Sequence, residues 1–448
     1  MKPITQRGAE RGMPKRAMAA VRVPSITALS AAVAFVLAAP AHAATELDML
    51  KQDLAQQRQM LEKQQQVIER LEEKLSRQAA APVSAGPAAR AAEEKPLVTI
   101  YGILDGGVEH ITNIGADGES LTRVPPITAT LPSRIGFRLH KEVRPGLAAI
   151  GVLEAGFNLD DGNQLQAGRI FGRQLYAGLE TPYGSFTVGR QWSMLTAAMM
   201  GSDQLGPNIY GMGSLDSYLP NSRYDNSLAW KHKIGGVSMG LSYSFGHDTS
   251  GGTPASGTCA GEQNSIADTQ ECRAWSAMAR YDGANFGVAG GIDQISGGTG
   301  ASAFFFNGAA PFAFSNSNDE DLRTTLGGYV KLGKAKLGVG WLGRKVDTTA
   351  VSVESDAYYL SASYQLTPVI RFDGGIHHII NDDQDRDATL SVVRGFYTID
   401  KGLDAYAQVG HIDNSDNASY QLSGAGGGTA PAAGGSQNGY MLGLRYIY

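Results

Sequence analysis

Apolar and aromatic side chains occupy every second position in the last nine residues of the chain, and the chain ends on an aromatic ring. Side chains alternate between the two faces of a β-strand, so this spacing gives one continuous apolar face. The residues on that face are Tyr440, Leu442, Leu444, Tyr446 and Tyr448. The pattern is typical of a closing, lipid-facing strand of a membrane barrel, but a single amphipathic edge strand of a soluble protein would look the same.

The rest of the chain decides between these interpretations, because strand-like segments of similar length recur through residues 97–448. We predict sixteen strands, near residues 97–110, 132–142, 147–157, 170–180, 185–191, 223–233, 237–246, 272–282, 285–293, 321–332, 335–344, 355–366, 368–379, 387–399, 402–411 and 438–448.

The connections between these segments alternate in length. Short turns are predicted at residues 144–146, 181–184, 234–236, 282–284, 333–334, 367–368 and 401–402, and the other eight connections are expected to be long and polar. Even strand number and strict alternation are typical of bacterial outer-membrane barrels, in which short turns face the periplasm and long loops face outward. The predicted fold is therefore an all-β, 16-stranded antiparallel transmembrane β-barrel preceded by a periplasmic α-helical coiled coil.

Residues 1–43 are predicted to be a secretory signal peptide. A basic lead precedes the apolar stretch 26–40, and the small-residue site Ala41-His42-Ala43 follows it. The apolar stretch is shorter than the roughly 20 residues that a membrane-spanning helix needs.

Residues 44–78 are predicted to form the coiled coil. Leu and Ile recur at heptad position a, and Leu or Gln at position d, from Leu47 to Leu75. A single amphipathic helix lying on another surface is the alternative. The Ala/Pro-rich residues 79–96 are predicted to be a linker. The barrel itself would occupy 97–448.

Charge and cysteine content narrow the function classes. The signal holds six basic residues and one Glu, so its removal takes the net charge from −5 to −10, which disfavours nucleic-acid binding. The two cysteines, Cys259 and Cys272, lie in one polar stretch between predicted strands and are expected to form a disulfide in an oxidising compartment.

Metal binding and catalysis are not expected from the sequence. His377 and His378 are adjacent on a predicted strand and point to opposite faces, so joint metal binding is not expected. The acidic stretch 381–387 is expected to be a solvated loop, with a Ca²⁺ site as the alternative. We predict no catalytic residues, because no Gly-x-Ser-x-Gly motif sits between a predicted strand and a helix. We also predict no metal and no cofactor.

Several motifs occur in the order found in one known family. They are Val98-Thr-Ile-Tyr-Gly-Ile-Leu-Asp105, Ser133-Arg-Ile-Gly-Phe137, Leu153-Glu-Ala-Gly-Phe157, Arg169-Ile-Phe-Gly-Arg-Gln-Leu-Tyr-Ala-Gly-Leu179 and Tyr183-Gly-Ser-Phe-Thr-Val-Gly-Arg-Gln191. On these residues the chain resembles the general porins of Gram-negative bacteria, most closely the β-proteobacterial type. The resemblance implies a homotrimer of water-filled barrels, each narrowed by its third long loop. It also implies outer-membrane lipid, lipopolysaccharide and the barrel-assembly machinery as partners.

The resemblance locates the candidate pore residues. The third long loop, residues 192–221, contributes Asp203 and Asp216 with Tyr210 and Tyr218 as aromatic neighbours. A basic wall opposite the loop is expected from Arg134, Arg173, Arg190 and Arg223, since an arginine facing lipid at the membrane centre costs roughly 2–4 kcal/mol.

Alternation on the first strand turns Asp105 and Glu109 toward the lumen, and Glu154 is expected near the arginines. General porins often carry a basic residue where Ile103 stands, so the sign of ion selectivity stays open.

Two features depart from the family. The chain ends on Tyr448 where the family usually ends on Phe, so the aromatic assembly signal is kept. Most general porins also lack the N-terminal coiled coil, although one sugar-specific porin has a comparable periplasmic extension.

The predicted function is a passive diffusion channel for ions and small hydrophilic solutes. One alternative is a porin specific for a sugar or organic acid, in which Tyr210 and Tyr218 stack against solute. Another is a structural tether in which the coiled coil binds peptidoglycan. The expected location is the outer membrane, with the N-terminal extension in the periplasm.

Overall fold

The computed structural model describes residues 66, 97–129, 132–206, 208–219, 222–246, 268–298 and 300–448. The chain divides into two units, Met1–Glu94 and Lys95–Tyr448. The predicted signal peptide, coiled coil and linker lie outside the described residues, apart from Gln66, so these assignments stay predictions. The second unit holds the barrel.

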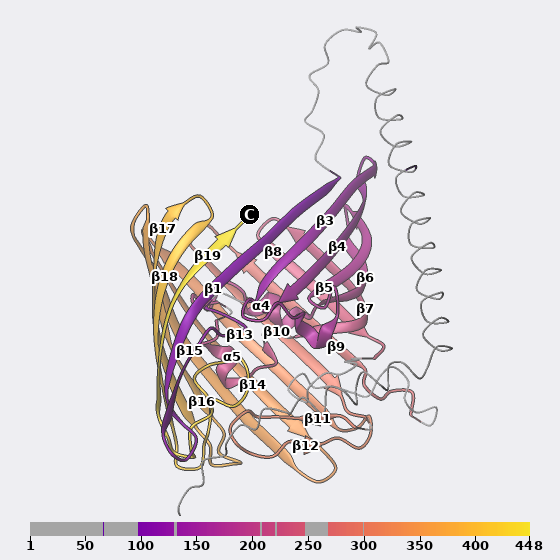
Figure 1. Ribbon diagram of the computed structural model, residues 1–448. Coiled ribbons are helices and arrows are strands. Elements are labelled where there is room, and N and C mark those ends of the chain that lie inside the picture. Colours follow the sequence, from indigo (N-terminus) through magenta and orange to yellow (C-terminus); the bar gives the residue numbers. More distant parts are fainter. Residues whose placement is uncertain are drawn as a thin grey trace, which may run out of the picture. The chain divides into compact units, whose positions relative to one another are not determined.

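Sixteen antiparallel strands close into a β-barrel, as predicted (Figure 1). They are β1 (Val98–Ile114), β3 (Ser133–Arg144), β4 (Leu147–Phe157), β5 (Gln174–Thr181), β6 (Gly184–Trp192), β7 (Arg223–Ile234), β8 (Val237–Ser244), β9 (Ala274–Asp282), β10 (Phe286–Ser296), β13 (Glu320–Leu332), β14 (Ala335–Asp347), β15 (Ser352–Thr367), β16 (Ile370–Ile380), β17 (Ala388–Asp400), β18 (Leu403–Asn414) and β19 (Gln437–Ile447).

Six short elements lie among the described residues of the connections between the barrel strands. They are β2 (Glu119–Arg123), which pairs with the end of β1, the hairpin β11 (Ser302–Ala303) and β12 (Phe312–Ala313), and the short helices α3 (Leu165–Gly168), α4 (Met194–Met199) and α5 (Met212–Leu215).

The outer face of the barrel is apolar, as the alternation predicted. On β1, Leu104 and Val108 are 40% and 52% exposed, whereas Asp105 and Glu109 are 1% and 0% exposed. The same alternation holds on β19 up to its last residue: Tyr440, Leu442, Leu444 and Tyr446 are exposed, and so is Tyr448, which follows the strand. An apolar exterior around a polar interior is the pattern of a transmembrane barrel.

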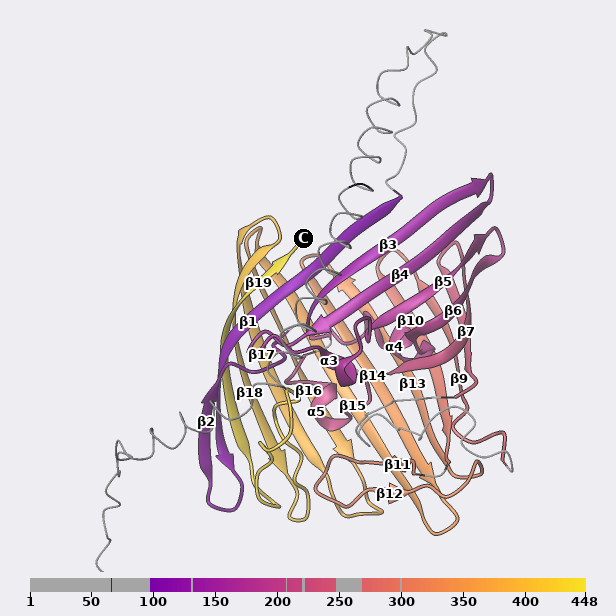
Figure 2. The ribbon, with the colours of Figure 1, turned by 45° about the vertical axis from the view of Figure 1, so that its right-hand side comes forward.

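The connections follow the predicted alternation with one exception. All seven predicted short turns are present, and they lie at the barrel edge that also carries the C-terminus (Figures 1 and 2). The connection between β14 and β15 was expected to be long but spans only residues 348–351, because both strands extend beyond their predicted ends. β5, in contrast, is shorter than predicted: it begins at Gln174, so Arg173 lies just before the strand.

The barrel closes by pairing the two ends of the sheet. β1 pairs with β19, and the backbone amides of Gly102 and Tyr448 each donate to the other residue's carbonyl oxygen. A Cβ at Gly102 would overlap the Tyr448 ring and the Arg134 carbonyl oxygen. The seam therefore requires glycine at position 102.

We expect Gly102→Ala to lower the yield of closed barrel, because the added methyl group would overlap the Arg134 backbone carbonyl oxygen on β3 as well as the C-terminal ring, and the backbone cannot move aside. The fraction of heat-modifiable protein on unheated gels measures this. Gly106→Ala is the matched control on the same strand, since its Cβ would meet only the flexible end of Leu159. Equal yields from both variants would contradict the requirement at position 102.

Candidate functional site

The connection between β6 and β7, residues 193–222, folds into the barrel, and we call it L3. Its helices α4 and α5 lie inside the ring of strands (Figures 1 and 2), and α4 packs against β8, β9, β10 and β13. Many of its apolar side chains are buried against the inner wall, among them Leu195, Leu205, Ile209 and Leu215. The resemblance to the porin family had implied an inward-folded loop at this place in the chain, and the helices of L3 lie inside the barrel.

Hydrogen bonds hold the first half of L3 against β15 and β16. The hydroxyls of Ser202 and Tyr359 lie 2.6 Å apart, and the Gln204 amide donates to the Ser361 hydroxyl over 2.9 Å. Asp203 Oδ2 lies 3.2 Å from His377 Nε2, and the His377 ring stacks on Tyr359. Asp203 was predicted to face the lumen, but its carboxylate instead contacts the wall behind the loop.

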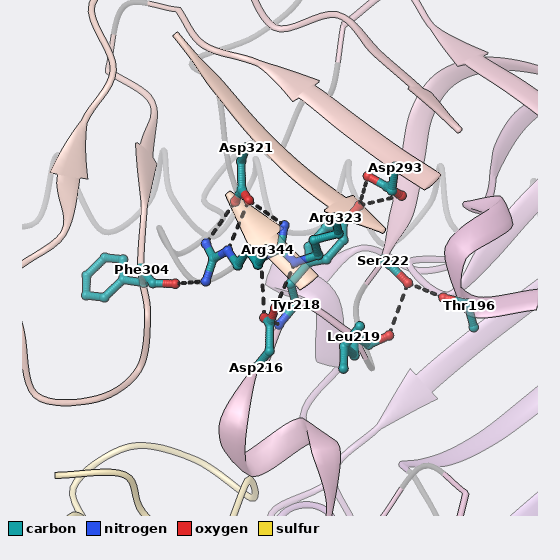
Figure 3. Close-up of polar contacts among 10 residues, drawn as sticks. All are labelled: Thr196, Asp216, Tyr218, Leu219, Ser222, Asp293, Phe304, Asp321, Arg323 and Arg344. Carbon is teal, nitrogen blue, oxygen red and sulfur yellow. Dashed lines mark hydrogen bonds and ion pairs between the residues drawn. The ribbon is translucent and has the colours of Figure 1, made fainter. Parts of the chain in front are cut away.

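The second half of L3 is fastened to β13 by a buried charge network (Figure 3). Arg323 Nε donates to Asp216 Oδ2 over 2.7 Å, and Arg323 Nη1 lies 2.9 Å from Asp321 Oδ1. Arg344 Nη2 donates to the other Asp321 oxygen over 2.8 Å. Arg323 and Asp321 are each 1% exposed. Asp216 is therefore balanced by β13 rather than presented to the pore as predicted.

The two loop tyrosines also turn away from the channel, with 0% and 1% of Tyr210 and Tyr218 exposed. The Tyr218 hydroxyl donates to Asp293 on β10 over 3.1 Å, and Arg323 lies over the Tyr218 ring. Burial raises the pKa of both phenols well above the usual range, with Glu109 adding to the effect at Tyr210 and Asp293 at Tyr218. Both residues therefore fix the loop, which corrects the expectation of a solute-stacking role.

The opposite wall carries the predicted arginines. Arg173 Nε donates to Glu154 Oε1 over 2.7 Å, and Arg134 Nε lies 3.8 Å from the other oxygen of Glu154. Tyr101 also donates to Glu154, over 2.9 Å. Glu154 thus joins two of the predicted arginines, consistent with the electrostatic role expected for it.

Two further predicted arginines complete this wall. Arg190 Nη1 lies 2.5 Å from Asp225 Oδ1, and Arg169 Nη1 lies 3.3 Å from Asp225 Oδ2. The Arg223 guanidinium lies 3.7 Å from the centre of the Trp192 ring, and Arg173 lies 5.6 Å from it. We call the five arginines and their partners Glu154, Asp225 and Trp192 the arginine wall.

Sequence reasoning missed three members of the wall. Arg169 opens one of the family motifs, while Asp225 and Trp192 lie within two residues of the selected Arg223 and Arg190. Their roles depend on pairing between β6 and β7, which sets Trp192 opposite Arg223. The sequence could have indicated Trp192 and Asp225, because both lie beside selected arginines on two strands that were predicted to be consecutive.

Asp105 and Glu109, the other two residues predicted to face the lumen, lie inside the barrel, and each carboxylate accepts a hydrogen bond from another side chain. Asp105 accepts a hydrogen bond from Tyr406 over 2.7 Å, and Glu109 accepts one from Arg123 Nε over 2.8 Å. Cys272 is buried and disulfide-bonded, while Cys259 lies outside the described residues, so their pairing stays a prediction.

Within the described ranges, no group of three or more His, Cys, Asp or Glu side chains could hold a metal ion. In the acidic stretch 381–387, Asp387 accepts a hydrogen bond from the Asn381 amide and Asp385 accepts one from the Asn417 side chain. No helix in the described part of the chain is long and apolar enough to cross a membrane.

A closed sixteen-stranded barrel with an apolar exterior, a folded-in loop and a charged inner wall defines a channel protein of the outer-membrane type. Residues 79–417 match the family model described as Gram-negative porin. The chain belongs to this Gram-negative porin family, which is a family of channels rather than enzymes.

A curated relative is also described as a porin. An outer membrane porin protein of Bordetella pertussis is 32% identical over 174 residues, which cover 35% of this chain and 45% of that protein. The chain thus matches less than half the length of this curated relative.

Solved structures share the fold. An anion-selective porin from Comamonas acidovorans superposes with a TM-score of 0.66 at 21% identity, covering 78% of this chain and 99% of that one. OmpT of Vibrio cholerae superposes with a TM-score of 0.57 at 17% identity, covering 80% and 99% of the two chains.

Proposed function

We propose that the protein is a passive diffusion channel of the outer membrane, narrowed by L3, that favours small anions over cations. The observation that carries this proposal is the charge of the arginine wall. Five guanidinium groups there share two carboxylates, Glu154 and Asp225, which leaves a net charge of +3.

The loop does not offset this charge, because its acids have partners elsewhere. Asp216 is paired with Arg323, and Asp203 contacts His377. Fixed charges at the narrowest part of a channel set its ion preference, so a wall with a net charge of +3, facing a loop whose two acids are turned toward other strands, favours anions. The Comamonas porin is described as anion-selective, but the argument for this chain rests on its own arginines.

The reversal potential of the refolded protein in planar bilayers, under a potassium chloride gradient, tests the proposal. We expect the sign of an anion-preferring channel. Arg134→Gln should reduce the anion preference, because Arg134 is 17% exposed and Arg173 still holds its partner Glu154. A cation-preferring wild type would overturn the proposal.

Lys334→Gln is the matched control for charge. Lys334 lies in the turn between β13 and β14, where its Nζ donates to the Leu366 carbonyl oxygen over 3.2 Å. This variant changes the net charge by the same amount but leaves the arginine wall intact. We expect its reversal potential to equal that of the wild type.

We also propose that the channel assembles as a homotrimer. One solved structure of OmpT is described as the trimer form. Small residues, including Ala149, Gly151 and Ala177, line an apolar hollow of about 610 Å³ on the outer face of β3–β6, which a second subunit could fill. The mass of the detergent-solubilised protein tests this, and a monomeric mass would contradict it.

Two alternatives were left open by the sequence, a solute-specific porin and a structural tether to the cell wall. Burial of Tyr210 and Tyr218 removes the aromatic surface on which a solute-specific site was based. The tether depends on residues 46–78, outside the described residues, so loss of cell-wall co-sedimentation on deleting them remains its test. Lipopolysaccharide and the barrel-assembly machinery are further partners that we propose for a protein of this fold and location.

A further inference from the structure

A second group of basic side chains lies on strands outside the arginine wall, at the barrel edge that carries the short turns. It consists of Arg280 on β9, Lys331 on β13 and Lys336 on β14, around the ring of Tyr329. Their strand neighbours Tyr281, Val330 and Leu337 are exposed on the outer face, so alternation turns all three basic side chains inward.

Strand register brings the two lysines together. Lys331 is paired directly with Lys336 across the β13–β14 hairpin, one residue from its turn at either side. Like charges at directly opposed positions of adjacent strands repel each other and destabilise the pairing. The arrangement therefore keeps an electrostatic cost that a counter-charge would relieve.

The groups around the lysines supply only part of that counter-charge. Asp282 is ion-paired with Arg280 over 2.7 Å and accepts a hydrogen bond from Tyr329 over 2.8 Å. The nitrogen atoms of Lys336 and Lys331 lie 4.1 Å and 5.7 Å from the centre of the Tyr329 ring. An aromatic ring attracts cations without neutralising them, so among the described residues three cations share one carboxylate.

The cluster is also next to the narrowing loop. Lys336 Nζ donates to the Gly201 carbonyl oxygen over 2.8 Å, and Arg280 donates to the Met200 carbonyl oxygen. An anion that has passed L3 would meet this cluster at the end of the barrel that, in this class of protein, opens to the periplasm.

We propose that Arg280, Lys331 and Lys336 form a second anion-binding station, at the periplasmic exit, for small oxyanions such as sulfate, phosphate or a carboxylate. The inference rests on the proposed function, because it concerns the path of an anion that the arginine wall admits. Lys331 is its most accessible member, since its side chain is exposed.

The probe is sulfate, added to the wild-type channel while chloride current is recorded at an ionic strength of about 0.01 M, where charges act over roughly 30 Å. We expect sulfate to block the wild type in a concentration-dependent way. In Lys331→Gln the sulfate concentration for half-block should rise roughly tenfold to thirtyfold, the effect in water of removing one charge about 4–6 Å from a divalent anion.

Two controls separate binding from misfolding. Lys334→Gln removes one charge from the same hairpin and should retain wild-type block, since Lys334 Nζ donates to the Leu366 carbonyl oxygen on the neighbouring hairpin. At about 1 M salt, where the screening length is roughly 3 Å, wild type and Lys331→Gln should conduct equally. Lys331 is the better choice than Lys336, which also holds the Gly201 carbonyl.

The second station would be overturned if sulfate did not block the wild type. It would also be overturned if sulfate blocked the wild type and Lys331→Gln equally. Loss of block in Lys334→Gln as well would also overturn it, because the effect would then follow net charge alone. A cation-preferring reversal potential would instead overturn the proposed function. The failures of the two proposals are therefore distinguishable.

Discussion

Replacing Asp216 with asparagine should destabilise the folded barrel by about 3–5 kcal/mol, the usual cost of removing one partner from a buried ion pair. Asparagine keeps the oxygen that accepts the Tyr218 amide hydrogen bond, so the substitution preserves this contact within L3 while removing the charge and the Oδ2 acceptor that face Arg323. Arg323 would then share Asp321 with Arg344. Guanidinium-induced unfolding in detergent micelles measures the free energy.

Asp203→Asn is the control within the same loop, and we expect it to cost less because the partner of Asp203 is the imidazole of His377. A double-mutant cycle of Asp216→Asn with Arg323→Met should show strong coupling, since removing both partners leaves no unpaired charge. If Asp216→Asn unfolds at the same denaturant concentration as the wild type, Asp321 alone suffices to hold Arg323.

Substituting alanine for Gly338 should narrow the channel. A Cβ at this inward position on β14 would overlap the carbonyl oxygen of Ser202, so L3 must move away from the wall and into the lumen. Overpacking of this kind typically costs about 1–3 kcal/mol. We expect a lower single-channel conductance together with a lower unfolding midpoint.

The matched control is Gly290→Ala on β10, where an added Cβ would meet its nearest neighbour, the Thr325 carbonyl oxygen, at 3.5 Å. This is an ordinary contact, and the control should conduct like the wild type. A Gly338→Ala channel with unchanged conductance and stability would show that L3 is not pressed against β14.

The strands were predictable because two local signals coincide. Alternation fixes which side chains face outward, as Leu104 and Val108 against Asp105 and Glu109 illustrate, and short turns fix where each hairpin ends. Where the turn signal was weak, the prediction failed. Between β14 and β15 the largely polar segments 345–347 and 352–354, each with one valine, were assigned to a loop, although they pair across a connection of four residues.

The site was predictable only in part. Alternation and the cost of a lipid-facing arginine place Arg134 and Arg223 inside, but neither rule says which wall the loop acids contact. Asp216 and Arg323 are 107 positions apart, and Asp203 and His377 are 174 apart. Such partners are decided by how L3 crosses the lumen, which depends on packing among many strands at once.

The last hairpin of the chain completes the surface on which L3 rests. The Tyr210 ring packs against Gly410 of β18 and Gly439 of β19. The Gly424 amide donates to the Ile209 carbonyl oxygen over 2.7 Å, and the Ser214 hydroxyl donates to that of Leu422. The constriction is thus finished only when the final strands are in place, so the step that closes the barrel through the β1–β19 pairing also completes the support of L3.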